Sequence, residues 1–134
     1  MTVADSSVVV AAFASWHEHH RPARLALSPG TTVVGHSVLE AYSVLTRLPP
    51  PHRAPGDVVR DFLTARFPGP HLFLEPDAHK ALVSRLVNLG ISGGATYDAL
   101  IAMTAISAGA SLLTRDRRAA STYQRCGAAV RFIP

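Results

Sequence analysis

Cysteine, lysine and tryptophan are almost missing from this sequence: Cys126, Lys80 and Trp16 are each the only residue of their type among 134. A single cysteine excludes an intramolecular disulfide and a cysteine-based zinc module, and it is typical of a reducing cytoplasm. No apolar run reaches the ~20 residues of a membrane span. The start of the chain has no cationic segment, so we expect no cleaved signal, no membrane association and a cytoplasmic protein.

Acidic residues are also scarce: nine Asp and Glu stand against thirteen Lys and Arg, which gives a formal net charge of +4. Nearly all the basic residues are arginines, whose planar guanidinium suits phosphate, so this excess is a mild indication of nucleic acid. A hydrophobic content of 48% with 16% charged residues excludes intrinsic disorder. The length suits one compact domain, which we expect to cover residues 1–134.

Short apolar runs rich in β-branched residues alternate with helical patterns along the chain. We predict strands over 2–4, 31–34, 71–74, 111–114 and 129–133. We predict helices over 6–14, 15–27 (divided at Pro22), 37–48, 57–67 (capped by Asp57), 77–89, 96–108 and 117–125. This alternation favours an α/β fold with a mainly parallel sheet of four to five strands. Such sheets bind ligands at the carboxyl ends of their strands.

Four of the few acidic residues fall at that edge of the predicted sheet. Asp5 directly follows the first strand, and Asp116 follows the strand over 111–114. Glu40 and Asp98 lie in the first turns of predicted helices, which face the same edge. Because the neighbouring residues are apolar, four converging carboxylates would repel one another strongly, and helix N-termini offset this by only about 1 kcal/mol each. A divalent cation that prefers oxygen ligands, Mg²⁺ or Mn²⁺, would hold them together.

This pattern of acids suits phosphodiester hydrolysis. A bound divalent cation activates a water and neutralises charge in the transition state, so no side-chain nucleophile is needed. Each acid also has a structural role open to it. Asp5, Asp98 and Asp116 are each placed to cap or support a helix N-terminus, and Glu40 with Ser37 has the spacing of a capping box. The metal-site hypothesis therefore depends on all four acids together.

The segments around these acids resemble the motifs of PIN-domain ribonucleases, specifically the VapC toxins of bacterial type II toxin–antitoxin pairs. The similar segments are Val3–Val9, Ser37–Ala41, Thr96–Ala102 and Leu112–Asp116. The resemblance covers nearly the whole chain and implies a three-layer α/β/α sandwich with a mainly parallel sheet. It also implies a Mg²⁺- or Mn²⁺-dependent endoribonuclease. The catalytic and metal-binding residues that it implies are Asp5, Glu40, Asp98 and Asp116, with Ser6 or Ser7 and Thr114 as supporting polar groups.

The resemblance further implies a substrate and partners. The expected substrate is structured RNA, such as tRNA or rRNA, whose cleavage stops translation. The expected partners are a second copy of the chain and a small VapB antitoxin that blocks the site. Many members carry a further acid after the fourth motif, where this chain has Arg117 and Arg118, so the number of metal ions, one or two, stays open. These two arginines and Arg115 are candidates for contacting RNA phosphate, with a solvated helix face as the alternative.

Two other functions and one unassigned cluster stay open from the sequence. A receiver-like domain also uses acids and Mg²⁺, to accept a phosphoryl group, but it needs a lysine at the site, and Lys80 lies inside a predicted helix. A PIN-like domain without catalysis would only bind RNA or a protein. The cluster Trp16–His20 has three interpretations: a zinc site using His17 and His20, an RNA contact near the mouth of the site, or a solvated helix face.

Overall fold

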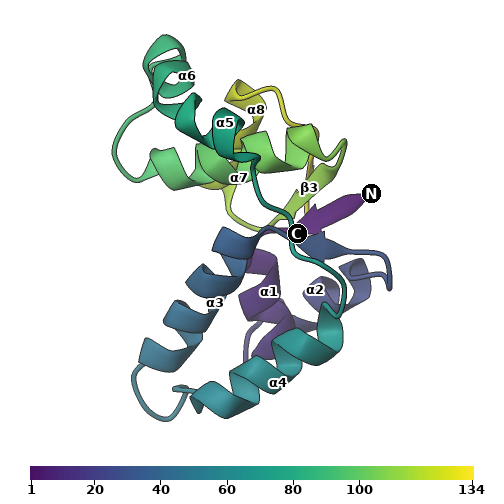
Figure 1. The fold of residues 1–134 in the computed structure, drawn as a ribbon. Coiled ribbons are helices and arrows are strands. Elements are labelled where there is room, and N and C mark those ends of the chain that lie inside the picture. Colours follow the sequence, from purple (N-terminus) through teal and green to yellow (C-terminus); the bar gives the residue numbers. More distant parts are fainter.

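The computed structural model describes residues 1–134, and four parallel strands form its single sheet (Figure 1). The strands are β1 (Thr2–Ala4), β2 (Thr32–Val33), β3 (Ser111–Thr114) and β4 (Val130–Phe132), in the spatial order β2-β1-β3-β4. The two central strands pair Val3 with Leu112. Because every pair is parallel, all the carboxyl ends lie at one edge of the sheet.

Helices cover both faces of this sheet (Figure 1). One face carries α1 (Ser6–Phe13), α2 (His20–Ala26), α3 (Gly35–Arg47) and α4 (Gly56–Arg66). The other carries α5 (Pro76–Lys80), α6 (Leu82–Leu89), α7 (Ala95–Ser107) and α8 (Arg117–Arg125). None of these helices has the length and apolar character needed to cross a bilayer.

The alternation of side chains along the central strands produces these layers. Val3 and Leu112 belong to a core of 16 buried residues with side chains of α6, α7 and α8. The next residue on each strand, Ala4 and Leu113, belongs to a second core of 15 buried residues with α1 to α4. Successive side chains of a strand point to opposite faces, so each central strand is buried on both sides. This arrangement confirms the predicted three-layer α/β/α sandwich.

The predicted strand over 71–74 is wrong. Leu72 makes only an isolated parallel bridge with Val34, at the outer side of β2. Its N–H donates to the Val33 carbonyl and its own carbonyl accepts from the Gly35 N–H, each at 2.9 Å. Prolines at 68, 70 and 76 lack an N–H and limit the ladder to this one residue. The sheet therefore has four strands, the lower of the predicted four to five.

The start of α3 also differs from the prediction, and this changes the position of Glu40. Val34 is the N-cap and the helix begins at Gly35, so the capping box of Ser37 and Glu40 does not form. Glu40 lies in the second turn instead of the first. Ser37 is fully buried, and its Oγ has no hydrogen-bond partner. The helix starts early because the Gly35 N–H is held by the Leu72 carbonyl, in the bridge between Val34 and Leu72.

Three further boundaries are corrected by the structure. Helix α2 starts at His20, so Pro22 lies in its first turn, where a missing N–H costs no intrahelical bond, and it divides nothing. The predicted helix over 77–89 is two helices, α5 and α6. Pro55 is the N-cap of α4, and Asp57 lies in the first turn.

Candidate active site

Asp5 occupies the carboxyl end of the central strand β1 and is only 2% exposed. It is the N-cap of α1: its Oδ1 accepts from the N–H groups of Ser7 (3.0 Å) and Val8 (3.3 Å), and from the Ser7 hydroxyl. Its Oδ2 accepts from the Tyr123 hydroxyl at 2.9 Å. Burial raises the pKa of Asp5, and these hydrogen bonds act in the opposite direction. The cap and the candidate ligand are thus the same side chain.

Tyr123 is a site residue that the sequence analysis did not identify. It lies on α8, one turn after Ala119, and is 1% exposed. Burial and the adjacent Asp5 raise the pKa of Tyr123 above the usual range, so its hydroxyl keeps its proton and donates. The sequence does place Ala119 and Tyr123 on one stripe of the helix, and a buried tyrosine hydroxyl needs a partner. Which residue is that partner depends on how α8 packs against β1.

The change Tyr123→Phe is expected to lower the free energy of unfolding by about 1–2 kcal/mol, because Asp5 loses a buried hydrogen bond. Urea denaturation measures the change. Tyr97→Phe is the matched control, since Tyr97 is 55% exposed, and it should shift stability by no more than about 0.5 kcal/mol. Equal midpoints for Tyr123→Phe and the wild-type chain would show that the hydrogen bond does not stabilise the fold.

Ser7 and Thr114, two of the predicted supporting residues, connect the start of α1 to the end of the central strand β3. The Ser7 Oγ donates to Asp5 and accepts from the Arg115 N–H at 2.9 Å. The Thr114 Oγ lies 3.4 Å from the Ser7 Oγ and accepts from the Asp116 N–H at 3.0 Å. These contacts fix the end of β3 against the start of α1. They hold the backbone of Asp116 close to the buried carboxylate of Asp5.

We call Asp5, Glu40, Asp98 and Asp116 the acidic cluster. Burial first, and then the negative charges of Glu40, Asp116 and Asp5, raise the pKa of Asp98 to about 6, whereas Arg118 acts to lower it. Asp98 is in the first turn of α7, and Asp116 is the N-cap of α8. The fold therefore brings the four acids of separate segments within range of one another's charge.

Glu40 contributes a buried oxygen that no donor satisfies. Its Oε1 has no hydrogen-bond partner, and the Nε2 of His36 lies 3.7 Å away. Burial and the charge of Asp5 raise the pKa of Glu40. The His36 ring stacks on Tyr97, with ring centres 5.2 Å apart, next in sequence to Asp98. Buried polar atoms are normally satisfied, so this oxygen is where a cation would be accommodated.

The acidic cluster is not a ready-made metal centre. No three His, Cys, Asp or Glu side chains are gathered closely enough to hold an ion. The donor chemistry nevertheless fits Mg²⁺ or Mn²⁺, which take carboxylate oxygens. The Oε1 of Glu40 is buried without a donor, and burial together with three neighbouring carboxylates raises the pKa of Asp98. A divalent cation would relieve both.

The three arginines expected to contact RNA differ in their surroundings. Arg118 acts on the acidic cluster through its charge. The guanidinium of Arg117 lies over the ring of Phe132, 4.2 Å from the ring centre. Arg115 donates from Nη1 to the carbonyl of Ile133 at 2.6 Å. Only Arg118 is thus electrostatically linked to the cluster, while Arg115 borders Ser7.

The remaining predicted residues lie beside the acidic cluster rather than within it. Ser6 lines a separate cavity together with His17 and Arg115. The zinc interpretation of His17 and His20 gains no support, because no three His, Cys, Asp or Glu side chains lie close enough together to hold an ion. The segment 14–19 is a connection between α1 and α2, not part of a helix.

Comparison with known proteins agrees with this fold and its motifs. The PIN domain family model matches residues 2–124. Ribonuclease VapC40 of Mycobacterium tuberculosis is 45% identical over 133 residues, 99% of each chain. Ribonuclease VapC27 of the same species is 42% identical over 118 residues, 87% of this chain and 78% of that protein. This chain belongs to the PIN domain family, as a member of the VapC ribonucleases of toxin–antitoxin systems.

Solved structures show the same fold at low sequence identity. The structure of FitAcB from Neisseria gonorrhoeae has a TM-score of 0.70 and 20% identity, and the match covers 97% of this chain and 96% of that one. VapBC2 from Rickettsia felis, bound to a DNA fragment from its promoter, has a TM-score of 0.65 and 15% identity over 98% and 97% of the chains. These matches confirm the predicted PIN-like architecture.

Proposed function

We propose that this protein is a metal-dependent endoribonuclease, the toxin of a type II pair, which cleaves structured RNA such as tRNA or rRNA and so inhibits translation. One observation carries the proposal. Asp98 has a pKa raised to about 6 by burial and by three other carboxylates, one of which has a buried oxygen without a partner. Such mutual perturbation of acids at one edge of a sheet is typical of functional sites rather than of helix caps.

In the proposed hydrolysis, different residues bind the metal, orient Asp5 and contact the substrate phosphate. A divalent cation, when bound, supplies Lewis acidity that activates a water and neutralises charge on the phosphate. Asp5, Glu40, Asp98 and Asp116 would hold it. Tyr123 and Ser7 keep Asp5 in one orientation, each through a hydrogen bond to a different carboxylate oxygen. Arg118, beside the acidic cluster, offers positive charge to the substrate phosphate.

Cleavage of labelled total tRNA and rRNA tests this function. The purified chain is incubated with Mg²⁺, with Mn²⁺ or with EDTA, and the RNA is resolved on a denaturing gel. We expect discrete fragments that require a divalent ion. Intact RNA in all conditions, from folded protein, would contradict the proposal and favour a PIN-like domain that binds without cutting. The receiver-like alternative gains no support, because Lys80 is exposed at the end of α5.

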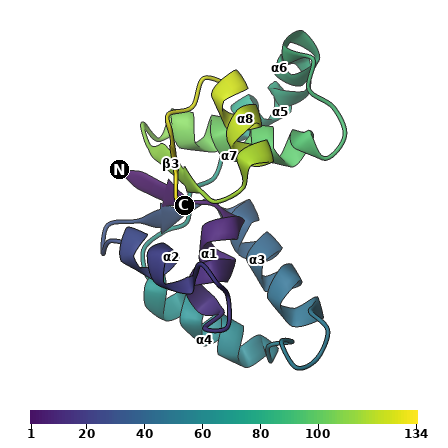
Figure 2. The same cartoon turned by 180° about the vertical axis from the view of Figure 1, so that it is seen from behind.

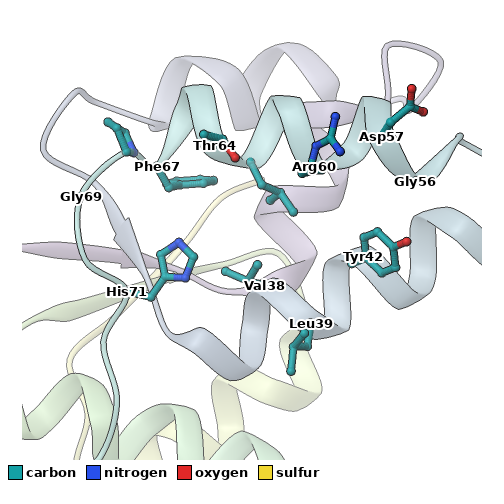
Figure 3. A pocket seen from close by; sticks show the side chains of 12 residues that line it. Val38, Leu39, Tyr42, Gly56, Asp57, Arg60, Thr64, Phe67, Gly69 and His71 are labelled. Carbon is teal, nitrogen blue, oxygen red and sulfur yellow. The ribbon is translucent and has the colours of Figure 1, made fainter.

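We also propose that a VapB-like antitoxin binds the groove between α3 and α4. Figure 3 shows this cavity of about 600 Å³, whose apolar lining includes Val38, Leu39 and Phe67. Leu39 is 70% exposed and precedes Glu40, so an apolar segment seated here would lie beside the acidic cluster. Membership of the VapC family, whose toxins pair with antitoxins, supports this partner. Asp57 and Arg60 also line the groove and offer polar contacts to the bound antitoxin.

The change Leu39→Glu is expected to weaken binding of the cognate antitoxin by about tenfold or more, because a charge replaces an exposed apolar anchor. It should leave stability within about 0.5 kcal/mol, as for other surface substitutions. Co-purification of the tagged pair measures binding. Val83→Glu, on an exposed apolar residue of α6, is the matched control. Undiminished capture by Leu39→Glu would place the antitoxin on another surface.

The homodimer stays a prediction of the family resemblance, and the cytoplasmic location stays a prediction from the single cysteine. We propose that the purified chain is a dimer, and sedimentation equilibrium measures its mass directly against the 14.2 kDa of one chain. A mass of one chain throughout the micromolar range would contradict the dimer. It would leave the acidic cluster untouched, because all four acids come from a single chain.

A further inference from the structure

Four aromatic rings outside the acidic cluster form a continuous row that ends at a cavity next to Ser7. Trp16 stacks on His52, with ring centres 4.1 Å apart and planes inclined by 30°. The row continues from Trp16 to His17 (5.9 Å) and from His17 to His19 (5.6 Å). We name Trp16, His17, His19 and His52 the ring row. It joins the connection after α1 to the loop between α3 and α4, two segments far apart in the sequence.

The row leads into a cavity of about 420 Å³ whose lining includes Ser7 but none of the four acids of the acidic cluster. The cavity is lined by Ser6 and Ser7 from the start of α1, by His17 and His19, and by Arg115. Ser7 is the residue whose hydroxyl donates to Asp5. Figure 2 shows the connection between α1 and α2 next to α1, on the side of α3. A ligand in this cavity would therefore be separated from the buried Asp5 by one side chain.

The exposure and charge of this surface distinguish it from ordinary packing. Trp16 is 47% exposed although tryptophan is the largest apolar residue, and His52 is exposed as well. Burial, and then the neighbouring His19 and Arg115, lower the pKa of His17. The one acid of the segment, Glu18, lies 3.2 Å from His19 and has 83% of its side chain exposed. The surface thus combines flat rings with donors for phosphate.

We infer that the ring row is a stacking surface for unpaired RNA bases, which positions the nucleotides flanking the scissile phosphate at the acidic cluster. The inference rests on the proposed ribonuclease function and identifies residues that bind the RNA substrate. Base stacking on exposed aromatic rings is the main mode of binding to single-stranded RNA, and cationic side chains follow its backbone. A duplex offers no accessible base faces, so this surface selects loops of structured RNA.

The single tryptophan makes the inference directly measurable, since all tryptophan emission of the chain comes from Trp16. A single-stranded oligoribonucleotide is titrated in EDTA, which prevents cleavage. Trp16 emission is followed with unlabelled RNA, and anisotropy with fluorescein-labelled RNA. We expect saturable quenching with the same midpoint as the anisotropy. Trp16→Ala should raise Kd by about tenfold, within the range found for base–aromatic stacking. A duplex of equal length should not quench.

Phe73→Ala is the matched control, because Phe73 is an exposed aromatic residue (74%) that lines a different cavity. It should bind RNA as the wild-type chain does. In metal-supported cleavage, Trp16→Ala should raise KM and leave kcat unchanged. Binding without quenching, together with wild-type affinity of Trp16→Ala, would overturn the inference while metal-dependent cleavage still upheld the ribonuclease. Absence of both cleavage and binding would overturn both proposals.

Discussion

Asp98→Asn is expected to reduce metal-dependent RNA cleavage by at least about 100-fold, since metal catalysis contributes several kcal/mol and each 1.36 kcal/mol is a tenfold change in rate. Asparagine has the same shape but no charge, so the acidic cluster loses one of its four carboxylates without a cavity. Initial rates on one labelled RNA, at saturating Mn²⁺, measure the effect. A rate within a few-fold of wild type would remove Asp98 from the catalytic site.

Stability provides the control for this variant, because the loss of activity must not come from unfolding. The pKa of Asp98 is raised to about 6 in the folded chain, so the metal-free fold binds that proton more tightly than the unfolded chain does. Stability therefore falls as pH rises from about 4 to 6 and stays lower above that range. Asp98→Asn should stabilise the metal-free protein at pH 7.5 by about 1 kcal/mol, a value reduced for partial exposure. Near pH 4 the gain should vanish.

Asp5→Ala should abolish cleavage too, but with the opposite effect on the fold. The change removes the N-cap of α1 and leaves the buried hydroxyl of Tyr123 and the half-buried hydroxyl of Ser7 without their acceptor. We expect a loss of about 2–3 kcal/mol in the free energy of unfolding, from a cap of ~1 kcal/mol and the unpaired hydroxyls. Thermal and urea denaturation of the metal-free protein measure it.

Asp116→Ala is the control for that loss, since Asp116 caps α8 from an exposed position. Its stability cost should stay near the ~1 kcal/mol of a cap alone. Equal costs for Asp5→Ala and Asp116→Ala would show that the hydrogen bonds of Tyr123 and Ser7 add nothing. A stable Asp5→Ala variant that cleaves RNA normally would contradict both assigned roles of Asp5.

The sequence predicts the layers of this fold well because its central strands carry local signals. Val3-Ala4 and Leu112-Leu113 are apolar on consecutive positions, as strands buried on both faces must be. The acids Asp5 and Asp116 directly follow these strands, so their common edge follows from parallel pairing alone. The resemblance to PIN domains rests on segments that contain these same residues.

The errors lie where tertiary contacts override local patterns. The segment 71–74 has the apolar pattern of a strand, but only Leu72 pairs with the sheet, through a single bridge to Val34. The same contact fixes Gly35, begins α3 early and moves Glu40 into the second turn. Tyr123 could not be assigned to Asp5 from the sequence, because 118 positions separate them and only the packing of α8 brings them together. Likewise, the stacking of Trp16 on His52 joins two loops.

Binding of Mn²⁺ to the acidic cluster tests the central claim most directly, and electron paramagnetic resonance measures it as loss of the free-ion signal during titration. We expect saturable binding by the wild-type chain, greatly weakened binding by Asp98→Asn, and unchanged binding by Ser6→Ala, whose side chain lines the neighbouring cavity. The number of ions bound also shows whether Arg117 and Arg118, in place of a further acid, restrict the site to one metal. Folded wild-type protein that binds no Mn²⁺ at millimolar concentration, or equal binding by Asp98→Asn, would contradict the account.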